Sequence, residues 1–218
     1  MGLFVQFGCG LKAPTSWTNF DASPRLRLER LPGGKLLVRI ATGTGPLFPS
    51  NALWGDVTRR LAVSDSSADG VFCSHTLEHL SSQDVDRALQ EALRILKPGG
   101  VFRIVVPDLR WRAEAYLRQA AAKDERAADQ FLSSTMLGEK RRARTLAAIA
   151  RTMFGNSAHR WMFDFASLAR RLTSIGFVDV RRCEFGDAAQ PAFKDVEERS
   201  RFFAGENREL AVEARRPS

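Results

Sequence analysis

The chain has 218 residues, a length that suits one domain with a sizeable core. Hydrophobic residues make up 44% and charged residues 27% of the sequence, which excludes an intrinsically disordered chain. The formal net charge of +8 admits an anionic partner, but the arginine-rich run at 140–144 lacks the interleaved aromatic residues that stack on bases and is more typical of a solvated helix face.

Targeting and redox signals are weak. No apolar run approaches the roughly 18 residues that span a bilayer, and residues 1–10 lack the basic start and long apolar stretch of a signal peptide. We therefore expect a cytoplasmic protein without a membrane span. Cys9, Cys73 and Cys183 are far apart and odd in number, so reduced, buried thiols are expected rather than a disulfide framework or a CxxC metal pair.

Two short apolar runs near the N-terminus predict buried parallel strands. Phe4–Phe7 precedes a Gly-Cys-Gly turn, and Thr18–Asp21 ends in a carboxylate. The brief connection between them contains Pro14 and leaves room for one or two helical turns at most. Residues 23–53 are rich in proline and glycine, and predict loops around one strand at residues 36–40.

A strand–helix–strand unit follows. Residues 71–73 predict a strand, and apolar residues recur at helical spacing over residues 85–96, after two serines that can cap the helix. Residues 97–100, Lys-Pro-Gly-Gly, end this helix, and residues 101–106 predict a strand covered on both faces. Repeated units of this kind predict a doubly wound, mostly parallel α/β sheet that binds ligands at the carboxyl ends of its strands.

The second half of the chain begins with a different composition. Residues 111–158 are rich in alanine and arginine without a strand signal, and predict a helical cap or insertion within a single domain spanning residues 1–218. Beyond it, Asp164 can cap a helix that Gly176 ends in a left-handed turn. Residues 177–181 and 208–214 predict the last strands.

Several sequence blocks share an order and spacing that carry more weight than any one of them, because a lone GxG is a weak signal. They are FGCG at 7–10, WTNFD at 17–21, GDV at 55–57, SHTLEHL at 74–80, LKPGG at 96–100, VPDL at 106–109 and HRWMFD at 159–164. In this order they resemble the class I S-adenosylmethionine-dependent methyltransferases, particularly a small bacterial branch linked to polysaccharide and sugar-related pathways. The resemblance covers nearly the whole chain and implies a seven-stranded, Rossmann-like methyltransferase sheet.

The resemblance also implies a site for S-adenosylmethionine at the strand ends. A glycine loop would cradle the amino-acid end of the cofactor, one carboxylate would accept hydrogen bonds from the ribose hydroxyls, and a second would contact the adenine. A plain turn and ordinary loop aspartates are the structural alternatives. The implied cofactor-binding residues are Gly8, Cys9, Gly10, Asp21, Asp56, Val57, Ser74 and His75.

The sequence departs from the family pattern in two ways. Gln6 stands where many members carry an acid two residues before the first glycine, which weakens charge pairing with the ammonium of the cofactor. The helix that usually follows the glycine loop is missing. Both departures keep open a methyltransferase-fold scaffold or regulator that has lost the cofactor.

Methyl transfer to oxygen usually needs a base for the hydroxyl proton, and histidine suits that role near neutral pH. His79 follows the fourth predicted strand, and His159 precedes an aromatic segment, Trp161 to Phe163, that would cover an acceptor pocket or join the core. We therefore take His79 and His159 as candidate catalytic residues, with a structural histidine as the alternative for each.

His75, Glu78 and His79 spell H-x-x-E-H, the order of an inverted zinc-peptidase motif. That motif needs a long helix, whereas these residues follow a strand and precede the next helix. We expect no metal here, although the resemblance leaves a divalent ion at an acidic and histidine cluster as a lesser alternative.

The leading functional hypothesis is a methyltransferase that uses S-adenosylmethionine to methylate a hydroxyl of a sugar, glycan intermediate or other small metabolite. Its partner would be a small-molecule or carbohydrate acceptor. The alternatives are the inactive scaffold and, less favoured, a nucleic-acid methyltransferase suggested by the net charge of +8.

Overall fold

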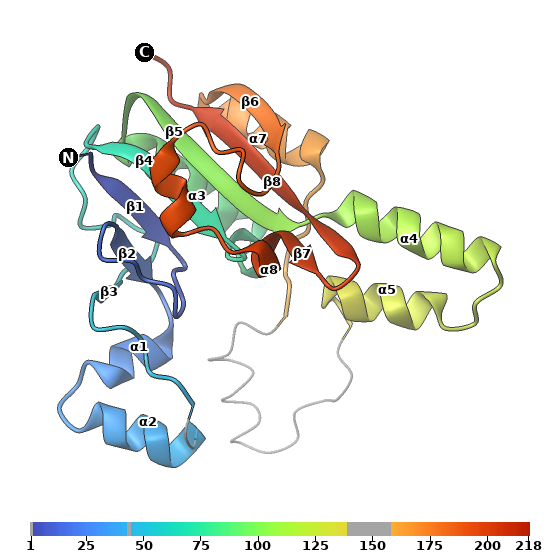
Figure 1. The fold of residues 1–218 in the computed structure, drawn as a ribbon, viewed down its shortest axis with the longest axis horizontal. Helices are drawn as coiled ribbons and strands as arrows, with labels where there is room; N and C mark the ends of the chain where they lie inside the picture. The colour runs from blue at the N-terminus through green and yellow to red at the C-terminus, as the bar shows by residue number, and fades with distance from the viewer. Residues whose placement is uncertain (1, 43–44, 139–157) are drawn as a thin grey trace.

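The computed structural model describes residues 2–42, 45–138 and 158–218, and is built on one open sheet (Figure 1). The main sheet has seven strands in the order β3-β2-β1-β4-β5-β8-β6, and the short β7 pairs with β8 outside this path. The first five strands are parallel, while β8 runs antiparallel to both β5 and β6. The strands are β1 Phe4–Phe7, β2 Thr18–Asp21, β3 Ala52–Trp54, β4 Ala68–Ser74, β5 Leu96–Pro107, β6 Val178–Cys183, β7 Phe203–Ala204 and β8 Asn207–Arg215. The expected doubly wound, mostly parallel sheet is confirmed.

Two amphipathic helices cover one face of the sheet. They are α3, Ser82–Ile95, and α7, Phe165–Ile175. Their apolar faces join the strands in the main core, because residues such as Leu89 and Leu172 are fully buried there. The Arg171 guanidinium on α7 donates to the Ser82 hydroxyl at 2.6 Å and so fixes the two helices against each other.

The opposite face is covered by the segment between β6 and β8. It contains the 3₁₀ helix η2, Pro191–Asp195, and the short helix α8, Arg199–Phe202. Phe193 of η2 and Phe202 of α8 join a second buried cluster with Trp17 and Phe72. This aromatic layer shields the second face where no long helix lies among the described residues.

Helices α1, Pro24–Glu29, and α2, Gly34–Thr42, lie beyond the β3 edge of the sheet (Figure 1). The predicted strand at residues 36–40 is therefore wrong. Val38 is buried, whereas Leu36, Leu37 and Ile40 are all more than half exposed. This spacing is typical of a helix whose outer face is apolar. The strand was predicted from the apolar content of residues 36–40 alone.

The helical region after β5 forms a hairpin that projects from the sheet (Figure 1). Its helices are α4, Leu109–Ala121, and α5, Ala127–Thr135, so it begins two residues earlier than predicted. The buried Arg112 anchors it, donating to both Glu209 oxygens on β8 at 2.8 and 3.0 Å. The remainder of the predicted 111–158 insertion, including Lys140, Arg141, Arg142 and Arg144, falls largely in residues 139–157, outside the described residues.

Several other sequence predictions are confirmed. Ser81 caps α3, and Asp164 and Gly176 bound α7, with Gly176 at a φ of +113°. The predicted strands at residues 71–73, 101–106, 177–181 and 208–214 correspond to β4, β5, β6 and β8 with shifted ends. The cysteines are free and buried. In the part of the chain that the structure describes, no helix has both the length and the apolar character needed to cross a membrane.

The cap of α7 gives the first prediction. The Asp164 carboxylate accepts from the Ser167 amide at 2.7 Å, and this bond holds the pKa of Asp164 below its usual range. A depressed pKa in the folded state gives stability that is present above the ordinary aspartate pKa and is lost as the pH falls. Asp164→Ala should therefore lower the free energy of unfolding by about 1 kcal/mol at neutral pH.

Urea unfolding of both proteins measures this difference. The gap between wild type and Asp164→Ala should shrink as the pH falls below about 4, where the wild-type carboxyl becomes protonated. Asp164→Asn is the control, because asparagine caps a helix without a charge. An equal gap at low and neutral pH would contradict the ionised cap.

Candidate active site

A cavity of about 220 Å³ opens where the parallel strands β1, β2 and β4 end. The parallel register of these strands brings three chain segments to one edge of the sheet. Larger hollows of about 420 and 440 Å³ lie along α4, away from the glycine loop. The described residues that line the cavity are Phe7, Gly8, Gly10, Asp21, Ala22, Gly55, Asp56, Val57, Ser74, His75, Thr76, His79, Leu80 and Arg201.

The glycine loop and the second strand meet at this cavity. The Gly10 amide donates to Asp21 Oδ2 at 2.8 Å. Both glycines have a left-handed φ, +68° at Gly8 and +53° at Gly10, which favours glycine. A Cβ on Gly8 would lie 1.9 Å from Thr76 Oγ1, whereas one on Gly10 would meet nothing within 4 Å. The loop therefore leaves open space over Gly10, whereas Gly8 lets Thr76 pack against the backbone.

The two aspartates keep acceptor capacity toward the cavity. Asp21 Oδ1 accepts from the Ser23 amide at 2.8 Å, and Asp56 Oδ1 accepts from the Thr58 amide at 2.9 Å. Each carboxylate oxygen has two lone pairs, so these bonds orient the groups without using all their acceptors. The Ser74 hydroxyl is buried without a hydrogen-bond partner. Open backbone, oriented carboxylates and an unpartnered hydroxyl together fit a polar, nucleoside-bearing cofactor.

Gln6 stands where many methyltransferases carry an acid, and its side chain has a structural role. Its amide donates to the Lys12 carbonyl at 2.5 Å and to Asn19 Oδ1 at 2.6 Å. Asn19 in turn donates to the carbonyls of Pro14 and Trp17 at 2.9 and 2.8 Å. Gln6 therefore braces the turns that connect β1 and β2, where no helix is present.

Cys9 is the one member of the glycine loop that turns away. Its side chain packs with Leu26 and Ala52, and Cys9 is not among the described residues lining the cavity. Burial, reinforced by the charge of Asp21, raises the pKa of the thiol to about 12. The thiol is therefore a neutral packing group at physiological pH.

His75 lies between the cavity and a buried carboxylate. It adopts a φ of +50°, and its Nε2 lies 2.9 Å from the Arg201 carbonyl. Its Nδ1 lies 3.3 Å from Glu78 Oε1, within ion-pair range but without the alignment of a hydrogen bond. Burial would lower the pKa of His75, but Glu78 outweighs it, so the pKa is raised.

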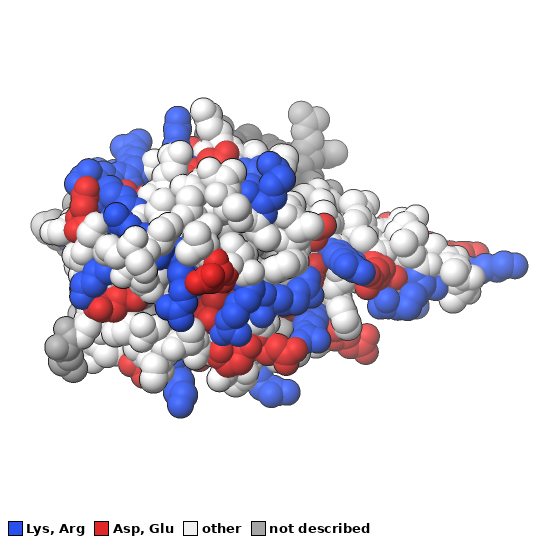
Figure 2. All heavy atoms as spheres, turned by 90° about the horizontal axis from the view of Figure 1, so that it is seen from above, with Lys and Arg blue, Asp and Glu red and all other residues white. Residues whose placement is uncertain are grey.

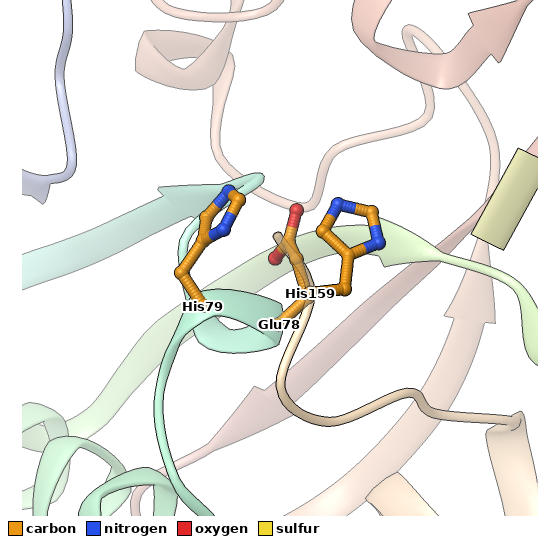
Figure 3. Close-up of side chains that lie close together, drawn as sticks. All are labelled: Glu78, His79 and His159. Atoms are coloured by element: carbon orange, nitrogen blue, oxygen red, sulfur yellow. The ribbon is translucent and has the colours of Figure 1, made fainter. Parts of the chain in front are cut away.

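The two candidate catalytic histidines come together from distant parts of the sequence (Figure 3). Their ring centroids lie 5.2 Å apart, with the planes at 66°. His79 lines the cavity, whereas His159 is not among its described lining residues and lies beside Glu78. Burial, partly offset by Glu78, lowers the pKa of His159, so its imidazole is neutral at physiological pH.

The aromatic segment after His159 divides between surface and core. Trp161 is 41% exposed and carries the Arg171 guanidinium 5.3 Å from its ring centroid, whereas Phe163 is fully buried. Sequence reasoning missed Thr76 and Arg201 in the cavity. Thr76 had a signal in its position after the fourth strand, but Arg201 had none, because it arrives from α8, which the sequence did not predict.

Comparisons with known proteins agree with this geometry. Residues 6–104, just under half of the chain, match the methyltransferase domain family Methyltransf_11. A probable methyltransferase of Aspergillus luteorubrus, ltbC, is 44% identical over 48 residues, which is 22% of this chain and only 17% of the fungal protein. The chain therefore spans a small part of that relative.

A solved structure shows the same likeness of fold. An S-adenosylmethionine-dependent methyltransferase from Methanosarcina mazei is 17% identical over 99% of this chain and 92% of its own, with a TM-score of 0.53. One from Thermotoga maritima, described as a possible histamine N-methyltransferase, is 19% identical over 99% and 83%, with a TM-score of 0.49.

The strand order, with its antiparallel β8, and the cavity at the strand ends define a class I α/β methyltransferase fold. Residues 6–104 match a methyltransferase domain, and the described chain shares its fold with an S-adenosylmethionine-dependent methyltransferase.

The Asp21 carboxylate gives the second prediction. Asp21→Ala removes the acceptor that holds the Gly10 amide and that faces the cavity. Losing a charged hydrogen bond of about 1.5–3 kcal/mol should weaken S-adenosylmethionine binding by roughly 10- to 100-fold, measured by calorimetry. Asp195→Ala is the control, because this exposed aspartate pairs with Ser16 away from the cavity and removes the same charge. Equal affinities of the two variants would show that Asp21 does not hold the cofactor.

Proposed function

We propose that the protein binds S-adenosylmethionine in the 220 Å³ cavity and methylates a hydroxyl of a sugar, glycan intermediate or similar small metabolite. The observation that carries the proposal is the 2.8 Å bond from the Gly10 amide to Asp21, which joins the two nucleotide-handling strand ends around one cavity. When bound, the cofactor supplies an electrophilic methyl group on a sulfonium.

The residues of the chain would hold the cofactor in named ways. Gly8 and Gly10 allow close approach of the backbone, Asp21 accepts from vicinal hydroxyls, and Asp56 accepts from the adenine amino group. Phe7 and Leu80 add apolar walls that help to exclude water.

The proton of the acceptor hydroxyl needs a destination. His79 is in the cavity wall, and its Nδ1 lies 3.2 Å from the Ala158 carbonyl. Because a carbonyl only accepts, this contact places a proton on Nδ1 and leaves Nε2 to accept a proton. His79, with His159 against its ring, is therefore our candidate general base.

A nucleic-acid acceptor receives less support from the described surface. Figure 2 shows lysine and arginine interspersed with aspartate and glutamate on the face it presents. Exposed arginines of the described chain also form ion pairs, such as that of Arg110 with Glu114 at 2.8 Å. This mixed surface attracts a polyanion less than a continuous basic face would.

Calorimetry with S-adenosylmethionine, followed by transfer of a labelled methyl group, tests the proposal. The full chain should bind the cofactor and label hydroxyl-bearing sugars or nucleotide sugars rather than RNA or protein. Asp21→Ala is the matched control for cofactor-dependent labelling. Absence of binding at millimolar cofactor would overturn the proposal in favour of a scaffold, and labelling confined to RNA would overturn the acceptor class.

A further inference from the structure

Glu78 stands apart from the other buried carboxylates that the structure describes. Its side chain is fully buried, and neither oxygen has a hydrogen-bond partner. Six others are paired with arginine, namely Glu29, Glu91, Asp108, Glu197, Glu209 and Glu213. Leaving a buried carboxylate without donors costs stability, so Glu78 needs an explanation in its surroundings.

Two imidazoles face this carboxylate. One ligand atom from each of Glu78, His79 and His159 lies within 4.8 Å of the others, and the Glu78 carboxylate points between the two rings (Figure 3). The His159 Nδ1 is also buried without a hydrogen-bond partner. Two unpartnered acceptor groups and a second histidine therefore converge on one point.

The backbone holds this geometry in place. The Glu78 carbonyl accepts from the amides of Arg160 and Trp161 at 2.7 and 3.1 Å, which fixes the segment after His159 against η1, Leu77–His79. The contact between His79 Nδ1 and the Ala158 carbonyl fixes the ring of His79 and leaves its Nε2 lone pair available. The His79 ring is thus oriented by a group outside the cluster, and the backbone next to His159 is held against η1.

We propose that Glu78, His79 and His159 bind a divalent transition-metal ion. Two imidazoles and one carboxylate are a ligand set that Zn²⁺, Co²⁺ and Fe²⁺ accept. The carboxylate compensates part of the charge of the ion, and the ion would bind a carboxylate that accepts no hydrogen bond. Three protein ligands leave coordination positions open.

The position of the site assigns the ion a role in catalysis, and this role rests on the proposed function. His79 belongs both to the cluster and to the wall of the cofactor cavity, so an ion bound there lies at the cavity edge. With the ion bound, His79 Nε2 would be a ligand and no longer the base, and a hydroxyl oxygen of the acceptor that fills an open position would lose its proton more readily, to solvent.

The main alternative is an ion pair between Glu78 and His75, whose Nδ1 lies 3.3 Å from Oε1. The chain has three histidines, and His75 is the one outside the cluster, so its substitution provides a matched control. If the cluster binds a metal, binding depends on His159 and not on His75. If Glu78 only forms an ion pair with His75, the chain binds no metal at this cluster.

The experiment titrates Co²⁺ into the full chain after chelator treatment, without cofactor or acceptor, and follows visible absorption and Zn²⁺ competition. Wild type and His75→Gln should bind Co²⁺, whereas Glu78→Gln and His159→Gln should bind at least about 10- to 100-fold more weakly. Zn²⁺ should raise the Tm of wild type by several degrees and leave that of Glu78→Gln unchanged.

The metal-free proteins provide the fold control. Metal-free Glu78→Gln should be at least as stable as metal-free wild type, because a neutral amide costs less to bury than a carboxylate that accepts no hydrogen bond. No Co²⁺ binding to wild type, or equal binding to wild type and His159→Gln, would overturn the site. Because no methyl transfer is measured, failure here is distinct from failure of the proposed function.

Discussion

A buried pair of amides, Gln6 and Asn19, holds the part of the molecule on which the cofactor site depends. They are register partners on the parallel strands β1 and β2, and Gln6 Nε2 donates to Asn19 Oδ1 at 2.6 Å. Their other bonds reach the carbonyls of Lys12, Pro14 and Trp17, so the connection has its polar groups satisfied by side chains instead of by a helix. The glycine loop is thereby fixed without a helix behind it.

The same constraint explains why two departures from the family pattern occur together. An acid at position 6 could accept from Asn19 but could not donate to the Lys12 carbonyl, whereas an amide does both. Without the helix, the loop needs that donor. Loss of the acid and loss of the helix are thus one structural solution, and neither by itself indicates a degenerate cofactor site.

The sequence predicted those parts of the fold and site that depend on local patterns. The strand ends at Gly8 and Asp21 could be placed at one edge because parallel strands end together, whereas β3 was not predicted and Asp56 was placed by the family resemblance alone. The helix α2 was missed, because Pro and Gly around residues 23–53 obscured its spacing. Arg201 in the cavity and the approach of His159 to Glu78 depend on tertiary contacts between distant segments, and no local pattern encodes them.

Some of the arginines of the chain stabilise the fold through buried ion pairs, which composition alone could not show. Arg103 lies fully buried on β5, donating to Glu213 at 2.9 Å and to Glu197. Arg112 pairs with Glu209 in the same way. Removing one member of such a pair leaves an uncompensated buried charge, so these arginines hold the aromatic layer and the α4–α5 hairpin to the sheet. Arg103 and Arg112 are thus engaged inside the protein and are not available to a polyanionic partner.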